Sequence, residues 1–199
     1  MQQANLFVFM GLIASGKSTL ARAFAEKLFL PCYNTDMVRK ELAGFSSSSR
    51  QGNAFNQGIY TPEFSRRTYD ALLAHARREL RQGRSLVLDG SYHKRAERER
   101  LRQCAEECDA TLSVILCQCD DAETERRLVR RARDPLAVSD GTWEIYQRQK
   151  ESMEFPGEMP ADDLVIIETN GPVPVVLAGV LARLAQKSRL PSLEVMTDE

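Results

Sequence analysis

The chain has 199 residues, which predicts one domain, and its 43% hydrophobic and 28% charged residues are typical of a globular protein. Its 27 basic residues, 21 of them arginine, are balanced by 28 acidic ones, so the formal net charge is −1. This balance argues against a protein that coats nucleic acid or a membrane surface. It is compatible with local arginine clusters that bind oxyanions, or with a genome that simply favours arginine codons over lysine codons.

The N-terminal apolar run, residues 5–10, lacks the preceding cationic stretch of a signal peptide. It is also too short to cross a bilayer, and no other segment approaches the about 20 apolar residues that a spanning helix needs. Five cysteines, an odd number, favour a reducing compartment. We therefore expect a cytoplasmic protein without a membrane partner, either a monomer or a homodimer.

The next segment, residues 11–18, matches the phosphate-binding pattern G-x-x-x-x-G-K-[ST] at every position. An apolar strand leads into it and an amphipathic helix follows, which is the context that the motif requires. The pattern predicts that backbone N–H groups and the helix N-terminus bind the phosphates of ATP. Lys17 is expected to neutralise the β- and γ-phosphates, and Ser18 to bind Mg²⁺. The predicted nucleotide-binding residues of this segment are Gly11, Ala14, Ser15, Gly16, Lys17, Ser18 and Thr19.

A short strand at 30–34 precedes Asp36 and a brief helix through Leu42. Because ligands bind at the carboxyl ends of parallel strands, Asp36 should face the phosphate-binding loop. We expect Asp36 to accept the proton of an acceptor hydroxyl, and Arg39 to bind an anionic acceptor. The alternative is that Asp36 only caps the helix. The segment that follows, residues 44–58, is rich in Gly, Ser and Asn and is predicted to be a mobile loop.

Thr61 and Pro62 predict the start of a long helix that carries His75 and ends at Gly83. A buried strand at 85–88 then ends in Asp89, the expected second ligand of Mg²⁺. His93 follows, either in the acceptor pocket or, as we favour, on the surface or at a helix cap.

Four cysteines, Cys104, Cys108, Cys117 and Cys119, raise the alternative of a zinc site. The first two lie on a predicted helix, about 95–108, and the last two at the far end of a predicted strand, 112–117, about 20 Å further along. The two pairs should therefore lie at opposite ends of the fold, and we expect ordinary thiols.

Five arginines lie within a predicted helix at 121–133: Arg126, Arg127, Arg130, Arg131 and Arg133. Spacings of three and four place several on one face, where an arginine lid could neutralise the charge of a transferred phosphoryl group. We select Arg127 and Arg131 as catalytic. The alternative is electrostatic, because acids begin this helix and bases end it, as the helix dipole favours.

The last elements are a helix at 140–154, a strand at 164–167 and a helix that begins near Val173. Alternating strands and helices predict a three-layer α/β domain with a parallel five-stranded sheet. We assign the domain to residues 1–187 and a flexible tail to 188–199. No Asn-Lys-x-Asp motif of GTPases and no Leu-Ser-Gly-Gly motif of transporter ATPases is present, and the chain is short for a ring ATPase, which leaves a compact phosphotransferase.

Six segments carry a resemblance to a known family: GLIASGKST, NTDMVRKELAG, YTPEFSRRTYD, LVLDGSYHKRAERER, CDDAETERRLVRR and ETNGP. They resemble the small bacterial kinase-like P-loop proteins called AAA-family ATPases, over nearly the whole chain to about Leu184. The wider group includes polynucleotide 5′-kinases, chloramphenicol phosphotransferase, zeta toxins and gluconate kinases. The resemblance implies a P-loop fold with strand order 2-3-1-4-5 and an arginine-bearing helical lid.

By comparison with polynucleotide kinases, Lys17 and Ser18 belong to the phosphate loop, Asp36 is the general base and Arg39 binds the acceptor phosphate. Arg127 or Arg131 belongs to the lid, and Asn170, within 169–172, lies near the adenine. The implied activity is transfer of the γ-phosphoryl group of ATP, with Mg²⁺, to a hydroxyl of a small molecule or a nucleic-acid 5′-end. The alternative is a regulatory or toxin-like module that hydrolyses ATP and acts through a partner. The chain lacks the phosphatase domain of bifunctional end-healing enzymes.

Overall fold

The computed structural model describes residues 3–45, 61–133 and 142–190. Most of the predicted mobile loop, 44–58, and the end of the predicted tail lie outside these residues. In the described part of the chain, no helix has both the length and the apolar character needed to cross a membrane.

Five parallel strands form one sheet in the order β2-β3-β1-β4-β5, which confirms the predicted topology. The central strands are continuous apolar runs because helices cover both faces of the sheet. β2 is a short edge strand that begins two residues later than predicted, after Pro31, which has no N–H to donate. The strands are β1 (Asn5–Met10), β2 (Cys32–Asn34), β3 (Leu86–Asp89), β4 (Thr111–Gln118) and β5 (Leu164–Glu168).

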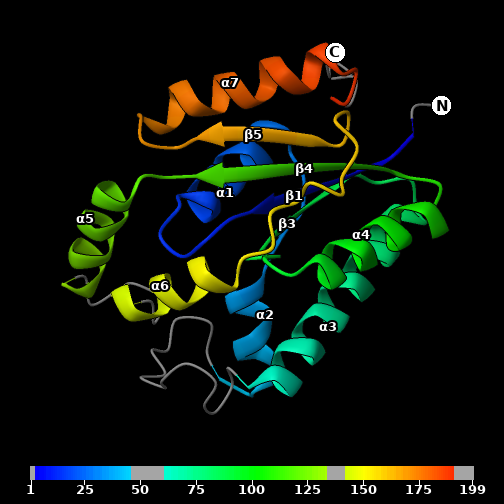
Figure 1. Cartoon of the computed structure of the whole chain (residues 1–199). Helices are drawn as coiled ribbons and strands as arrows, with labels where there is room; N and C mark the ends of the chain where they lie inside the picture. The colour runs from blue at the N-terminus through cyan, green and yellow to red at the C-terminus, as the bar shows by residue number, and fades with distance from the viewer. Residues whose placement is uncertain (1–2, 46–60, 134–141, 191–199) are drawn as a thin grey trace, which may run out of the picture.

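Helices pack on both faces of the sheet and make the predicted three layers (Figure 1). α1 (Lys17–Lys27) and α7 (Val173–Gln186) cover one face, and α3 (Pro62–Leu80) and α4 (Arg95–Glu107) cover the other. α2 (Thr35–Leu42) packs beside α3. α5 (Asp121–Ala132) and α6 (Trp143–Ser152) lie beyond the carboxyl ends of the strands, next to the loop that follows β1.

Side-chain caps fix where several helices begin. Thr61 Oγ1 accepts a hydrogen bond from Phe64 N, with Pro62 at the first helical position, as predicted. The short α2 is capped by Asn34, whose Oδ1 accepts from the N–H groups of Asp36 (2.8 Å) and Met37 (3.2 Å). The interpretation of Asp36 as the helix cap is therefore wrong, and its carboxylate is available to the adjacent cavity.

The cysteines of the zinc alternative lie in different parts of the core. Cys104 and Cys108 belong to the apolar cluster under α3 and α4, whereas Cys117 is buried in the cluster under α1 and α7. Residues 188–190, assigned to the tail, pack against the domain: Arg189 binds Asp163 (2.7 Å), and its carbonyl oxygen accepts from Asn5 Nδ2 (3.0 Å).

Candidate active site

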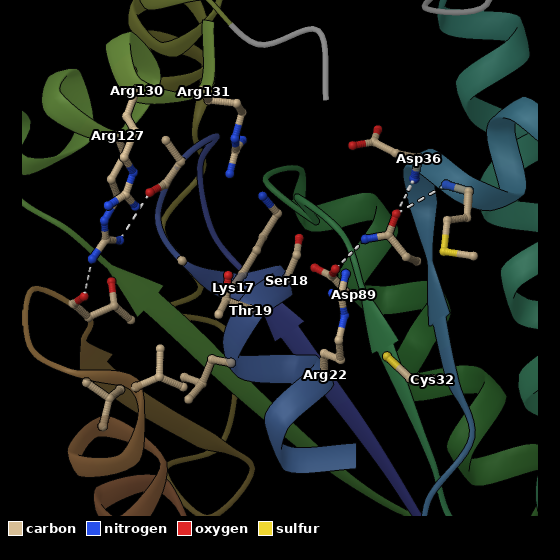
Figure 2. A pocket seen from close by; sticks show the side chains of 18 of the residues that line it. Lys17, Ser18, Thr19, Arg22, Cys32, Asp36, Asp89, Arg127, Arg130 and Arg131 are labelled. Atoms are coloured by element: carbon tan, nitrogen blue, oxygen red, sulfur yellow. Dashed lines mark hydrogen bonds between the residues drawn. The ribbon is translucent and has the colours of Figure 1, made fainter. Parts of the chain in front are cut away.

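A cavity of about 660 Å³ opens at the carboxyl edge of the sheet, where the ends of β1, β2, β3 and β5 meet (Figure 2). The lining includes most of the predicted site residues: Ala14, Gly16, Lys17, Ser18, Thr19, Asp36, Asp89, Arg127 and Arg131. Gly11, Ser15, Arg39 and Asn170 lie outside the lining. The sequence motifs thus converge on one cavity, as the topology requires of loops at the carboxyl ends of parallel strands.

The phosphate-binding loop depends on three unusual backbone conformations. Gly11 (φ 149°), Ala14 (φ 59°) and Gly16 (φ 83°) all have positive φ, which is costly for residues other than glycine. A Cβ on Gly11 would lie 2.5 Å from the carbonyl oxygen of Cys117, so no other residue fits there. Gly16 directly precedes α1, and its turn directs the helix N-terminus at the cavity, where the first N–H groups have no partner within the helix.

Lys17 and Asp89 place opposite charges at the floor of the cavity. Lys17 Nζ donates to the carbonyl oxygen of Leu12 (3.3 Å), so the side chain spans the loop. Burial raises the pKa of the Asp89 carboxyl, while Lys17, Ser18 and Asn34 oppose that rise and the Asp36 carboxylate adds to it. The cause is desolvation of a charged group that is almost completely enclosed.

The Ser18–Asp89 pair has the chemistry of a magnesium site. Asn34 Nδ2 donates to Asp89 Oδ2, whereas Oδ1 is buried with no hydrogen-bond partner in the described part of the chain. Mg²⁺ prefers oxygen ligands and commonly binds through one or two carboxylates together with phosphates and water. A buried carboxylate oxygen beside a hydroxyl, facing a cavity next to the phosphate loop, fits that preference. The residues that could hold the ion are Ser18 and Asp89.

One carboxylate and two arginines lie in or next to the end of the cavity near β2 and α2, which is the predicted acceptor side. Asp36 lines the cavity and forms an ion pair with Arg39 (3.3 Å between Oδ1 and Nη1), whose side chain is 10% exposed. Arg39 thus contacts the predicted base rather than the cavity itself. Arg22 of α1 lines the cavity instead and is exposed. Cys32, which is exposed, also lines it; desolvation by the surrounding residues and the nearby Asp89 raise the pKa of its thiol, which is therefore protonated at neutral pH.

The two arginines selected from the predicted lid, which is helix α5, occupy different environments. Arg127 Nη1 donates to the carbonyl oxygen of Ala14 (3.2 Å), Nη2 to that of Thr169 (2.5 Å), and Nε to Glu123 (2.7 Å). Arg131 points into the cavity above Lys17 (Figure 2). Burial lowers the pKa of Arg131, the Asp36 carboxylate opposes that shift, and the neighbouring Arg127 and Arg130 add to it. Arg127 is held by the backbone, whereas Arg131 faces the space where phosphates would lie.

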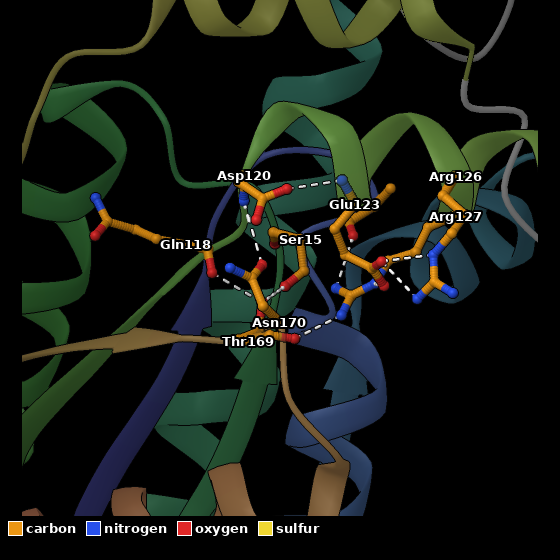
Figure 3. A network of polar contacts seen from close by, with 9 residues as sticks. Ser15, Gln118, Asp120, Glu123, Arg126, Arg127, Thr169 and Asn170 are labelled. Carbon is orange, nitrogen blue, oxygen red and sulfur yellow. Dashed lines mark hydrogen bonds and ion pairs between the residues drawn. The ribbon is translucent and has the colours of Figure 1, made fainter.

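The segment after β5 closes the other end of the cavity. Thr169 and Gly171 line it, and Thr169 Oγ1 donates to the carbonyl oxygens of Ser15 (2.6 Å) and Gln118 (2.9 Å). Asn170 is exposed and accepts from the backbone N–H of Asp120 (3.3 Å), as Figure 3 shows. Asn170 thus joins the segment after β5 to the start of α5, next to the cavity but not in its wall.

A family model described as an AAA domain matches residues 6–156. The chain belongs to this family. Uncharacterized proteins of Mycobacterium tuberculosis (strains H37Rv and CDC 1551) and Mycobacterium bovis are 30% identical to it over 131 residues, 66% of this chain and 26% of theirs. The AAA domain described here therefore spans about a quarter of the length of the curated relatives it matches.

Solved structures similar to this chain include small kinases. A gluconokinase from Sinorhizobium meliloti 1021 superposes with a TM-score of 0.64 at 21% identity over 93% of this chain and 94% of its own. A putative kinase from Chloroflexus aurantiacus gives 0.66 at 19% identity, over 92% and 100%. Kti12 of Chaetomium thermophilum, in complex with ADP-AlF3, gives 0.64 at 20% identity, over 89% and 98%. At these identities the likeness establishes the fold, which is that of kinase-like P-loop proteins.

Two residues of the cavity, Asn34 and Arg22, were not among the site residues predicted from the sequence. Asn34 caps α2 and binds Asp89, and its position directly before a helix was a capping signal that we assigned to Asp36. Arg22 enters the lining because it lies one helical turn after Ser18, a spacing of four. His93 lies outside the lining, half-buried, and its Nδ1 contacts Ser91 Oγ (3.1 Å); the cap position of α4 is Lys94, so the surface or capping role that we favoured is not what the structure shows.

Proposed function

We propose that the protein is a Mg²⁺-dependent phosphotransferase that moves the γ-phosphoryl group of ATP to a hydroxyl of an acceptor. The observation that carries the proposal is that Asp36 shares one cavity with the phosphate-binding loop and with Arg131. A hydroxyl that attacks the γ-phosphorus must lose its proton, and a carboxylate in the same cavity can accept it.

Each residue of the site has its own role in the proposed reaction. The N–H groups of the loop and Lys17 bind the phosphates, and Ser18 and Asp89 bind Mg²⁺, which would neutralise charge on the β- and γ-phosphates. Asp36 takes the proton of the acceptor hydroxyl while the hydroxyl oxygen forms a bond to the γ-phosphorus. The bond between the γ-phosphorus and the oxygen that bridges to the β-phosphate breaks, and ADP is released. Arg131 stabilises the charge on the transferred group. Arg127 holds the loop, and the segment with Asn170 borders the adenine.

The acceptor side favours a ligand with a negative charge. Arg22 lines this side, and Arg39 approaches from behind Asp36, so Arg39 orients the carboxylate in the proposed reaction and contributes positive potential to bound acceptor. Charge-assisted bonds from arginine suit carboxylate and phosphate groups. We therefore propose an anionic hydroxyl compound, either a small molecule or a nucleic-acid 5′-end, in the cytoplasm.

Kinases among the proteins of similar fold support the proposal, as does the complex of Kti12 with ADP-AlF3. The test is incubation with γ-labelled ATP, Mg²⁺ and pools of sugars, sugar acids, nucleosides, aminoglycosides and short oligonucleotides. We expect label in one pool, and none there with Asp36→Asn. Consumption of ATP with label only in inorganic phosphate, across all pools, would overturn the proposal and favour the regulatory or toxin-like module.

A further inference from the structure

Three consecutive residues of the phosphate-binding loop are each held by a side chain from outside it. The backbone N–H of Ile13 donates to Gln149 Oε1 (2.9 Å), the carbonyl oxygen of Ala14 accepts from Arg127 (3.2 Å), and that of Ser15 accepts from Thr169 Oγ1 (2.6 Å). Figure 3 shows Ser15 next to Thr169, with Arg127 directed at Thr169. The three donors and acceptors come from α6, α5 and the segment after β5.

Apolar packing reinforces the contact between α6 and the loop. Ala14 and Tyr146 are both almost completely buried and share a small cluster with Leu128 of α5. Trp143 packs against this cluster, as do Leu12 and Ile13, and its ring centre lies 5.0 Å from that of Tyr146. The side chain of Gln149 is therefore the polar member of an otherwise apolar contact between α6 and the loop.

α5 and α6 are also joined to each other at one carboxylate. Asp121, in the first turn of α5, accepts hydrogen bonds from Tyr146 (2.6 Å) and Lys150 (2.7 Å) of α6. The two helices thus meet the loop as a connected pair. A shift of α6 relative to the loop would have to break the bond to Gln149, the Asp121 contacts or both.

The bond to Gln149 matters because of what the loop must do. Backbone N–H groups of such loops bind phosphates only when the backbone holds a particular curl, and here Ala14, next to Ile13, is in the left-handed region. That conformation persists in a non-glycine residue when surrounding contacts determine it. Gln149 fixes the direction of the preceding peptide N–H, and Arg127 fixes the carbonyl that follows.

We propose that Gln149 is a positioning residue for nucleotide binding, and that through it α6 is coupled to occupancy of the phosphate-binding loop. The inference rests on nucleotide binding, one part of the proposed function, and not on phosphoryl transfer or on any acceptor. Gln149 keeps Ile13 bonded in both the free and the nucleotide-bound protein. Nucleotide in turn makes the loop, and with it α6, more rigid.

The chain carries its own probe of this coupling, because Trp143 is its single tryptophan and lies in the contact between α6 and the loop. Excited selectively, Trp143 reports the accessibility of this contact to a quencher such as acrylamide. We expect ADP with Mg²⁺ to reduce the quenching of Trp143 in the unmodified protein.

The test compares Gln149→Met with Gln147→Met. Methionine has nearly the same length as glutamine but offers only a weak acceptor, and Gln147 is exposed on the same helix. For Gln149→Met we expect about fivefold weaker ADP binding by calorimetry, as for loss of one hydrogen bond, and no reduction of Trp143 quenching at saturating ADP. Gln147→Met should match the unmodified protein in both.

A third variant guards against a general packing defect. Gln149→Glu keeps an acceptor for Ile13 N–H, so it should retain the effect of saturating ADP on Trp143, and circular dichroism should show all variants folded. The proposal would be overturned if Gln149→Met bound ADP as tightly as the unmodified protein and ADP reduced the quenching of its Trp143 to the same extent. Tighter ADP binding by Gln149→Met would also overturn it, because Gln149 would then restrain the free loop in a form that opposes binding. Absence of any ADP binding by the unmodified protein would instead contradict the proposed function.

Discussion

The two ends of the cavity are built in different ways. At the nucleotide end, the loop after β1 is bonded to α5, α6 and the segments after β3 and β5, with Gly11 N–H donating to the carbonyl oxygen of Ser91 (3.3 Å). At the other end, where we propose that the acceptor binds and which we call the acceptor end, the short edge strand β2 leads into α2, and Asp36 and Met37 face the cavity with the exposed Arg22. One end is a fixed frame and the other is a set of side chains on the margin of the sheet.

The two ends differ in whether their chemistry is common to all P-loop proteins or specific to one acceptor. Triphosphate binding places the same demands on any P-loop protein, so the frame is determined by backbone geometry and a few charges. Recognition of an acceptor depends on side chains that can vary without disturbing the sheet, because β2 has only one neighbouring strand. Substitutions should therefore separate the two ends into effects on nucleotide binding and effects on transfer alone.

The largest effect is expected for Lys17→Ala at the nucleotide end. The change removes the ammonium group that spans the loop, so ADP and ATP binding should fall below detection by calorimetry and all ATP turnover should be lost. Lys27→Ala, in the last turn of the same helix and away from the cavity, is the matched control and should bind normally. Undiminished turnover by Lys17→Ala would contradict the nucleotide site as a whole.

Asp36→Asn should act only at the acceptor end. The amide cannot accept the proton of the hydroxyl, so transfer should fall about 10³-fold, within the range of general base catalysis, while the dissociation constant of ATP stays within about twofold. Glu41→Gln, an exposed carboxylate on the same helix, controls for the loss of charge and should leave transfer intact. A large loss of ATP affinity in Asp36→Asn would mean that the two ends are not separable.

The sequence predicted the nucleotide end better than the acceptor end for a physical reason. The glycines at 11 and 16, Lys17 and Ser18 are required by local backbone geometry and phosphate charge, so they recur as a contiguous pattern. The strand order was implied by the resemblance to kinase-like P-loop proteins, whereas the continuous apolar runs indicated only that helices cover both faces of the central strands. Arg39 and Arg127 show the limit: their positions were predicted, but their pairing with Asp36 and with backbone carbonyls depends on side-chain directions that no spacing encodes.

Loss of Arg131, the arginine of the predicted lid that faces the cavity, should have an intermediate effect on the transfer rate. Arg131→Gln removes the guanidinium that faces the cavity, and we expect the transfer rate at saturating ATP to fall about 10²-fold. That is less than a lone arginine finger contributes, because Arg127 and Arg130 also line the cavity. Arg126→Gln is the control, since Arg126 is 73% exposed and pairs with Glu123 of its own helix. Equal losses in the two variants would assign the arginines to helix electrostatics instead.

The smallest effect, on stability, is expected at the boundary between the two ends, where Asp89 is buried between Ser18 and Asn34. Burial raises the pKa of this carboxyl, so the folded protein binds its proton more tightly than the unfolded chain does. The free energy of unfolding without nucleotide should then decrease as the pH rises from the ordinary carboxyl range through the raised pKa. An uncharged residue of the same shape removes the free-energy cost of burying the Asp89 carboxylate in its charged form.

Asp89→Asn should therefore raise the Tm of the nucleotide-free protein at pH 8 by about 2–4 °C for each kcal/mol relieved, and abolish the further rise that ADP with Mg²⁺ gives over ADP alone. Asp162→Asn, an exposed carboxylate before β5, should change neither. Differential scanning calorimetry at pH 5 and pH 8 measures both the Tm of the nucleotide-free protein and the further rise that Mg²⁺ gives with ADP. A lower Tm for Asp89→Asn at pH 8 would show that Lys17 and Asn34 compensate the buried charge fully. In that case Asp89 would belong to the fixed frame of the nucleotide end and would not be a strained ligand held for the metal.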